Sequence, residues 1–306
     1  MGKEHQCKTV AVTGGSGRLG THVVRELLSQ GYQVRVLDRR APSAAVEFVQ
    51  LDTLDLDCVR EALRGVDAVI HLAAIDFDFQ APAEDYIRVN TLGTWHVLQA
   101  ANELGIQRAV VCSSISACGL SEANAAFPPE QLPVDESHPR YVIQPYSVSK
   151  VVIEEMAASF VRRGEMAVLC LRPMMVLTEP NIDPTVARAQ DEETRWLFYY
   201  VTPQDCARAF RCALEAESVR GGEFFITAQD SCRDEETLVW YERAWGRLPA
   251  MVDVEHYRRN PRASVFSGDK ARDQLGFVAS SNWRELLAGR AQAPADSGAP
   301  QNIAAS

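Results

Sequence analysis

A glycine-rich turn near the N-terminus limits the folds open to this chain more than any other feature. The segment TVAVTGGSGRLG at 9–20 places an apolar run directly before Gly14, Gly17 and Gly20, and a helical pattern begins at about Arg18. Such glycines allow a positive φ, a close approach of backbone to a ligand, and tight packing of helix on strand. The helix N-terminus directs free N–H groups at phosphates. The turn predicts a dinucleotide-binding α/β fold.

Short apolar runs alternate with amphipathic helical patterns after this turn. This alternation, with nearly continuous apolar strands, is typical of a parallel sheet covered by helices on both faces. We therefore expect a doubly wound parallel sheet of the Rossmann type with a small C-terminal substrate lobe. The expected strands are 9–13, 33–38, 46–51, 68–72, 109–113 and 168–172, and the expected helices are 18–30, 56–64, 85–104 and 146–163.

The pattern loosens after Pro173. We expect residues 1–172 to form the dinucleotide-binding domain and 173–287 to form the substrate lobe, from which about 197–227 returns to the main domain. Residues 288–306, rich in Ala, Gly, Pro, Gln and Ser, predict a disordered tail. Within the lobe the segment 178–195 is polar and suggests irregular structure. Regular elements are expected at 197–201, 204–215, 223–227, 234–245 and 269–275.

Charge and cysteine content narrow the possible partners. The net charge of −10 disfavours nucleic acid and anionic lipid as partners. No apolar run approaches the ~20 residues that span a bilayer, and the polar N-terminus lacks the apolar stretch of a secretion signal. The eight cysteines form no CxxC pair and no zinc-like spacing, so no metal is expected. Reduced thiols indicate a cytoplasmic protein.

Polar residues follow several of the expected strands. Asp38 ends the second strand, where a carboxylate can accept hydrogen bonds from ribose hydroxyls and repel the 2′-phosphate of NADP. Arg39 and Arg40 beside it can bind that phosphate, so NAD is favoured and NADP stays open. Asp52 follows the third strand and could contact adenine. The small Ala73 after the fourth strand would let a cofactor pass close by, and simple packing explains it equally well.

Tyr146 and Lys150 form the second strong signal. In PYSVSK they stand four residues apart on an expected helix and share one face. A tyrosine normally ionises near pH ~10, and a neighbouring ammonium favours the phenolate, which makes Tyr146 a usable general base. Ser114 ends the fifth strand, where its hydroxyl could bind a substrate oxygen, with Ser113 as the near competitor. Taken alone, such a Tyr–Lys pair is also found on solvated helix surfaces.

Several motifs in order resemble the extended short-chain dehydrogenase/reductases, the NAD-dependent epimerase/dehydratase group. They are TGGSGRLG, HLAA, YIRVNTLGTWHVLQAA, SSISACG, PYSVSK and LRP, between Val10 and Phe210, and KARDQLGF near the end resembles the closing helix of that family. The resemblance implies catalysis by Ser114, Tyr146 and Lys150, with NAD as cofactor. It implies a structural brace at Asn90 and a homodimer through 85–104 and the helix after Tyr146. The expected cofactor contacts are Gly14, Ser16, Gly17, Arg18, Leu19, Gly20, Asp38, Arg39, Asp52, Thr53, Leu72, Ala73, Ala74, Tyr146, Lys150 and Pro173.

Departures from the family pattern bear on the reaction. Ile115 and Ser116 stand where dehydratases carry an acidic pair, which disfavours dehydration. Many nucleotide-sugar epimerases have an asparagine shortly after Arg-Pro, and here none occurs before Asn181. The run TEPN, then Arg195 and FYYVTPQDCARAF, is similar to uronate dehydrogenases and suggests Arg195 as a carboxylate clamp. A solvent-facing arginine explains that residue as well.

The leading hypothesis is an NAD(P)-dependent dehydrogenase or reductase with Tyr146 as general acid/base. It acts on a secondary alcohol or ketone of a small polar, sugar-like molecule. Substrate contacts are expected at Ser114, Ile115, Ser116, Tyr146 and Arg195. One alternative is an epimerase that keeps NAD bound and returns the hydride to its substrate. Another is a dinucleotide-sensing regulator without chemistry, which would not need Ser114, Tyr146 and Lys150 together.

Overall fold

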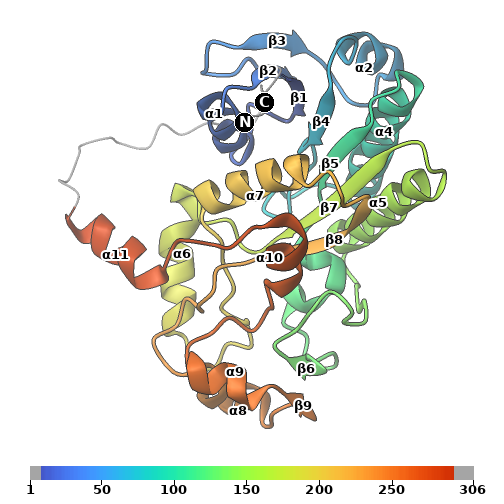
Figure 1. The fold of residues 1–306 in the computed structure, drawn as a ribbon. Helices are drawn as coiled ribbons and strands as arrows, with labels where there is room; N and C mark the ends of the chain where they lie inside the picture. The colour runs from blue at the N-terminus through green and yellow to red at the C-terminus, as the bar shows by residue number, and fades with distance from the viewer. Residues whose placement is uncertain (1–7, 293–306) are drawn as a thin grey trace.

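A seven-stranded parallel sheet forms the centre of the computed structural model, which describes residues 8–292 (Figure 1). Its strands hydrogen-bond in the order β3-β2-β1-β4-β5-β7-β8. The chain order changes direction between β1 and β4, which is where such sheets bind ligands at their carboxyl edge. The expected doubly wound sheet is confirmed. The strands are β1 (Thr9–Thr13), β2 (Gln33–Asp38), β3 (Glu47–Gln50), β4 (Ala68–His71), β5 (Arg108–Cys112), β7 (Ala167–Pro173) and β8 (Gly221–Ile226).

Alternate residues of the strands feed two separate cores, one on each face of the sheet. Val10 and Val12 of β1 pack with the buried residues of α1 and α7. Ala11, between them, packs with those of α2, α4 and α5 on the other face. Figure 1 shows these helices on the two sides of the sheet. Their bounds are α1 (Gly20–Ser29), α2 (Leu56–Ala62), α4 (Gly93–Glu103), α5 (Pro145–Arg162) and α7 (Pro203–Glu215).

The long helix expected at 85–104 is present as an unbroken helical run over 83–103, but its middle is π-helical. A short α3 (Ala83–Asp85) leads into the π-helical segment η1 (Tyr86–Leu92), and α4 follows. The hydroxyl of Thr91 donates to the carbonyl of Ile87, and that of Thr94 donates to Asn90 O at 2.6 Å. Bulges of this type often mark functional sites. This one turns the side chain of Asn90 into the interior.

The segment 178–195 was expected to be irregular, and this is wrong for most of it. Residues Glu179–Gln190 form α6, which starts with a proline in its first turn and contains Pro184. Only Ile182 and Thr185 are buried, so the sequence shows too narrow an apolar stripe to reveal a helix. Arg290 of α11 pairs with Asp183 at 2.7 Å and supports it. Tertiary contacts thus outweigh a pattern that includes a helix breaker.

The remaining elements lie after β5 and in the C-terminal lobe. In the segment 203–226, β8 joins the main sheet and α7 packs against it. Residues 197–201 form no strand and make only one bridge, between Val201 and Val176. Helix α11 runs to Gln292, so the start of the expected tail is helical, and 293–306 lie outside the described residues. The further elements are η2 (Ile115–Cys118), η3 (Leu120–Glu122), β6 (Gln131–Leu132), α8 (Thr237–Trp245), β9 (Met251–Val252), α9 (Val254–Arg259), α10 (Asp269–Leu275) and α11 (Trp283–Gln292).

Residues 8–292 show neither a membrane-spanning helix nor a cluster of metal-binding side chains. No helix in this range combines the length and apolar character needed to cross a membrane. No three His, Cys, Asp or Glu side chains in the same range are grouped to hold a metal ion. The seven cysteines within it are free thiols.

Candidate active site

The glycine turn packs so closely that side chains would not fit at two of its positions. Gly14 has a φ of +67°, and a Cβ on it would lie 2.7 Å from the backbone nitrogen of Ala73. A Cβ on Gly20 would lie 2.1 Å from the carbonyl oxygen of Gly14. Helix α1 begins behind Leu19 with no side-chain cap and no acid in its first turn. These features fit a pyrophosphate held against a helix N-terminus.

Asp38 joins the end of β2 to this turn. Its two carboxylate oxygens accept the backbone N–H of Ser16 at 3.0 Å and that of Arg40 at 3.1 Å. The Ser16 hydroxyl donates to the carbonyl of Arg40 at 2.7 Å, which closes the link. Arg39 is exposed, and its carbonyl accepts a bond from Gln50. Each oxygen of Asp38 keeps a lone pair that could accept a ribose hydroxyl.

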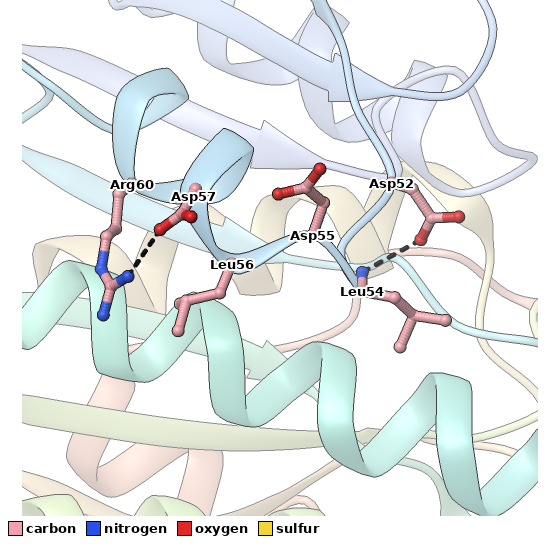
Figure 2. A pocket seen from close by; sticks show the side chains of 6 residues that line it. All are labelled: Asp52, Leu54, Asp55, Leu56, Asp57 and Arg60. Atoms are coloured by element: carbon pink, nitrogen blue, oxygen red, sulfur yellow. Dashed lines mark hydrogen bonds and ion pairs between the residues drawn. The ribbon is translucent and has the colours of Figure 1, made fainter.

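A surface hollow of about 590 Å³ opens beyond β3 (Figure 2). Figure 2 shows Asp52 and Arg60 at its opposite ends, with the Asp52 carboxylate accepting the N–H of Leu54 at 3.0 Å. Thr53 is buried and packs against Gly93 of α4, where an added Cβ would lie 2.6 Å from the Thr53 hydroxyl. Of the two expected contacts, Asp52 is therefore open to a ligand, and Thr53 holds α4.

A buried hydrogen-bonded chain fixes the backbone that faces the glycine turn. The Thr13 hydroxyl oxygen accepts the N–H groups of Leu72 and Ala73 at 3.2 and 3.3 Å, so it donates its proton to Nδ1 of His71 at 2.7 Å. His71 Nε2 then donates to the Thr94 hydroxyl at 2.9 Å. Burial, reinforced by the Lys150 charge, lowers the pKa of His71 to about 3. A neutral histidine thus positions the Leu72–Ala73 backbone.

Tyr146, Lys150 and Ser114 come together at the carboxyl edge of the sheet. Tyr146 lies in the first turn of α5, and Lys150 follows one turn later, with its Nζ 5.4 Å from the centre of the Tyr146 ring. Lys150 Nζ donates to the carbonyl of Cys112 at 2.9 Å. Ser114 follows β5, and its oxygen accepts the N–H of Ser116 at 3.1 Å. The motifs SSISACG and PYSVSK, which are separate in the sequence, therefore bring Ser114, Tyr146 and Lys150 close together.

The surroundings of Tyr146 hold its hydroxyl in the protonated form. Burial raises the pKa of Tyr146 well above 10, and the negative charges of Asp76 and Asp78 add to the effect. A hydrogen bond with Ser114 opposes the shift. A base role for this phenol therefore needs a positive charge beside the ring.

Ser113, the competitor of Ser114, is engaged elsewhere. Its hydroxyl donates to the carboxylate of Glu154 at 2.6 Å in the interior. Neighbouring residues at a strand end point to opposite faces, and here Ser114 faces Tyr146 whereas Ser113 faces the buried Glu154. Ser114 is thus the hydroxyl that remains for a substrate.

Residues 10–226 match the profile of the NAD dependent epimerase/dehydratase family. The chain belongs to this family. The matched span runs from the glycine turn to β8 and includes Ser114, Tyr146 and Lys150. The resemblance to the extended short-chain dehydrogenase/reductases, and with it the expectation of an enzyme, is confirmed.

Individual relatives show how far the likeness extends. The putative dihydroflavonol 4-reductase of Synechocystis sp. is 33% identical over 181 residues, 57% of this chain and 51% of that protein. The chain spans about half the length of the curated relatives that it matches in this way. A short-chain dehydrogenase/reductase superfamily protein from Agrobacterium tumefaciens, crystallised with NAD, has a TM-score of 0.72 at 24% identity over 93% of this chain and 97% of its own. The glucuronic acid dehydrogenase of Chromohalobacter salexigens has a TM-score of 0.66 at 19% identity, over 95% and 91%. These two structures share the fold.

The structure places three of the expected substrate contacts, Ser116, Ile115 and Arg195, in different surroundings. Ser116 lies beside Ser114 and accepts a hydrogen bond from Ser121 at 2.9 Å. The side chain of Ile115 is buried in the core. Arg195 is exposed after α6, and within residues 8–292 no ion pair or hydrogen bond joins it to the residues around Tyr146. Its role as a clamp stays a prediction.

Asn90 is a structural brace, as the sequence predicted, whereas the neighbouring segment 76–79 was not predicted to belong to the site. Asn90 accepts the N–H of Ile75 at 2.7 Å, and its amide donates to Ile75 O and to Ser149, both at 3.1 Å. It therefore ties the loop after β4 to α5. That loop continues as DFDF at 76–79, where Phe77 contacts Tyr146. The alternation of acids and aromatics, which begins one residue after HLAA, was the available signal.

Proposed function

We propose that this enzyme transfers hydride between a secondary alcohol or ketone of a small polar, sugar-like molecule and the nicotinamide of NAD. The observation that carries the proposal is the cluster of Tyr146, Lys150 and Ser114 at the edge of the sheet that holds the glycine turn. A phenol, an ammonium and a hydroxyl at one place are the groups that alcohol oxidation requires.

Each side chain has a distinct task in this proposal. The Ser114 hydroxyl holds the substrate oxygen, and Tyr146 removes its proton as the C–H hydride departs. Bound NAD supplies the hydride acceptor and a positive charge that favours the phenolate. Lys150, oriented by the Cys112 carbonyl, adds a second positive charge and can bind the nicotinamide ribose. In the reverse direction Tyr146 donates its proton to the forming alkoxide.

Removal of the phenolic oxygen of Tyr146 tests this mechanism. Tyr146→Phe should lower kcat about 10²–10⁴-fold, while NADH binding, followed by fluorescence titration, stays close to wild type. Turnover at a near wild-type rate in this variant would refute the role of the phenol. A panel of alcohols and sugars, with NADH formation recorded, identifies the substrate class.

Asp38 supports a preference for NAD over NADP. Its carboxylate would lie where the 2′-phosphate of NADP must sit, and its bonds to Ser16 and Arg40 hold it there. Arg39 is exposed and free to turn toward a phosphate, so NADP affinity is to be measured alongside. Asp38→Ala should narrow the difference between the two dissociation constants.

Epimerisation is the second candidate, favoured by the family to which the chain belongs. Against it stands Asn181, whose amide donates to the carbonyl of Val176 at 3.3 Å and so serves α6. An epimerase would purify with bound NAD and cause no net change in NADH absorbance. A non-catalytic dinucleotide sensor would leave all three catalytic side chains without a use.

A homodimer is proposed through η1 and α5. Ile87 and Leu92 of η1 and Val148 of α5 are exposed apolar side chains, and a second copy would cover them. Phe160 of α5 is buried against the sheet and does not contribute to this surface. A monomeric mass by light scattering would exclude the dimer.

A cytoplasmic location is proposed because the cysteines of residues 8–292 are free thiols.

A further inference from the structure

Two aromatic rings flank the catalytic phenol, and only one of them is open to a ligand. The ring of Phe77 meets the Tyr146 ring edge-on, with centroids 5.8 Å apart at 67°, and the ring of Tyr86 meets it at 6.0 Å and 77°. Tyr86 is 9% exposed, whereas Phe77 is 52% exposed. Phe77 thus forms an exposed apolar surface beside the ring of Tyr146.

The backbone that presents Phe77 is held from both sides. On one side Asn90 makes hydrogen bonds to both backbone groups of Ile75. On the other, Arg18 pairs with Asp76 at 2.9 Å and Asp78 at 3.1 Å. Because this backbone is held in place, the Phe77 ring stays exposed to water. The ring would be more stable if a ligand covered it. Its position suits contact with a ligand better than core packing.

Charge restricts which ligand can cover Phe77. Asp76 and Asp78 carry two negative charges, against one positive charge on Arg18, and all three side chains are partly exposed. Their field reaches the catalytic group, since both carboxylates contribute to the raised pKa of Tyr146. Lys150 is buried, and its ammonium is bound to Cys112 O. None of these side chains therefore offers a substrate anion an exposed, unpaired cation, and the two acids outnumber Arg18.

We infer that the substrate is an uncharged cyclic secondary alcohol that lays a C–H face on Phe77, in preference to a sugar acid or a nucleotide sugar. The inference rests on the proposed function and narrows it. A pyranose or a carbocyclic alcohol has such a face next to a ring hydroxyl. Its hydroxyl would reach Ser114 and Tyr146 while the ring covers Phe77.

Matched substrates test the charge requirement. Glucose and glucuronate differ by one carboxylate, as do galactose and galacturonate, and cyclohexanol supplies the ring without further hydroxyls. For the wild-type enzyme with saturating NAD, we expect kcat/KM to be at least tenfold higher for the best neutral compound than for either acid. A higher kcat/KM for a uronate would overturn the inference and leave hydride transfer intact. If no compound of either class reduced NAD, the proposed function would fail together with the inference.

Substitutions at Phe77 test the stacking contact. Phe77→Ala should raise KM for the neutral alcohol about tenfold or more, and Phe77→Tyr, which keeps the ring, should restore it. NADH titration shows whether the variant is folded and loaded. Phe79→Ala is the control, because Phe79 belongs to the same segment but contacts Arg18, at 5.4 Å. Equal KM values for Phe77→Ala and wild type would remove Phe77 from the binding site. Arg195→Ala tests the rival prediction that Arg195 clamps a substrate carboxylate. Loss of such a clamp would raise KM for the uronates and leave KM for the neutral compounds unchanged.

Discussion

The carboxylate of Glu154 accepts two hydrogen bonds from the guanidinium of Arg172, at 2.7 Å from Nε and 2.8 Å from Nη2. Neither side chain is more than 1% exposed. The same carboxylate accepts the hydroxyl of Ser113, next to Ser114, and pairs with Arg140 at 3.0 Å. This buried pair joins α5 to β7 and to the end of β5, beneath the candidate catalytic cluster.

Removal of the charge on Glu154 should destabilise the protein strongly. Glu154→Gln leaves Arg172 charged and unpaired in the interior, which lowers the free energy of unfolding by about 3–5 kcal/mol. Urea denaturation followed by fluorescence measures the loss. Glu155→Gln is the matched control, since Glu155 pairs with Arg162 on the surface, where the two side chains are 68% and 62% exposed. That variant should change the free energy by less than about 1 kcal/mol. Similar losses in both variants would contradict a special role for the buried pair.

The two adjacent serines should respond differently to substitution. Ser114→Ala removes the hydroxyl that faces Tyr146 and should lower kcat about 10²-fold or more, with the dissociation constant of NADH unchanged. Ser113→Ala removes a bond to Glu154 and should act mainly on thermal stability. Steady-state kinetics and thermal melts of the pair separate these effects. If Ser113→Ala lost kcat and Ser114→Ala kept it, the assignment would be reversed.

The pH dependence of alcohol oxidation should report on Tyr146. Because its pKa is raised, the phenolate is scarce at neutral pH, and kcat/KM at saturating NAD should climb as pH rises. The negative charge of Asp76 contributes to that high pKa. Asp76→Asn should therefore lower the pKa and move the rising limb of the profile to lower pH. Asp57→Asn, which alters an acid paired with Arg60 in the hollow beyond β3, serves as control. A limb that stayed in place or moved upward would show that Asp76 does not act on the phenol.

The fold was predictable where burial imposes a regular period. The expected strand at 33–38 coincides with β2, and the helix at 269–275 coincides with α10, which ends at Gly276 with a φ of +66°. The helix at 179–190 was missed because few of its residues are buried and because it contains Pro184, a residue that usually breaks helices. The π-helical segment was missed because an apolar period does not distinguish it from an α-helix.

The candidate site was predictable only where its residues are close in sequence. Tyr146 and Lys150 share a face because they stand four residues apart on α5. Which of Ser113 and Ser114 faces the site depends on Glu154, and no local pattern reveals that partner. The contact of Phe77 with Tyr146 joins a loop to a distant helix, and only the three-dimensional structure reveals it.

Gly20 allows a last test, of the dinucleotide turn itself. A methyl group on Gly20 would lie 2.1 Å from the carbonyl oxygen of Gly14, so Gly20→Ala must push α1 away from the turn. We expect NADH affinity to fall at least tenfold, together with a lower melting temperature. Gly289→Ala is the matched control, because a Cβ there meets nothing within 4 Å and Gly289 lies in α11. An alanine in a helix interior is favoured by up to ~1 kcal/mol over glycine, so this control should keep or gain stability and bind NADH normally. If Gly20→Ala bound NADH with unchanged affinity, the close packing of α1 on the turn would not be needed for dinucleotide binding.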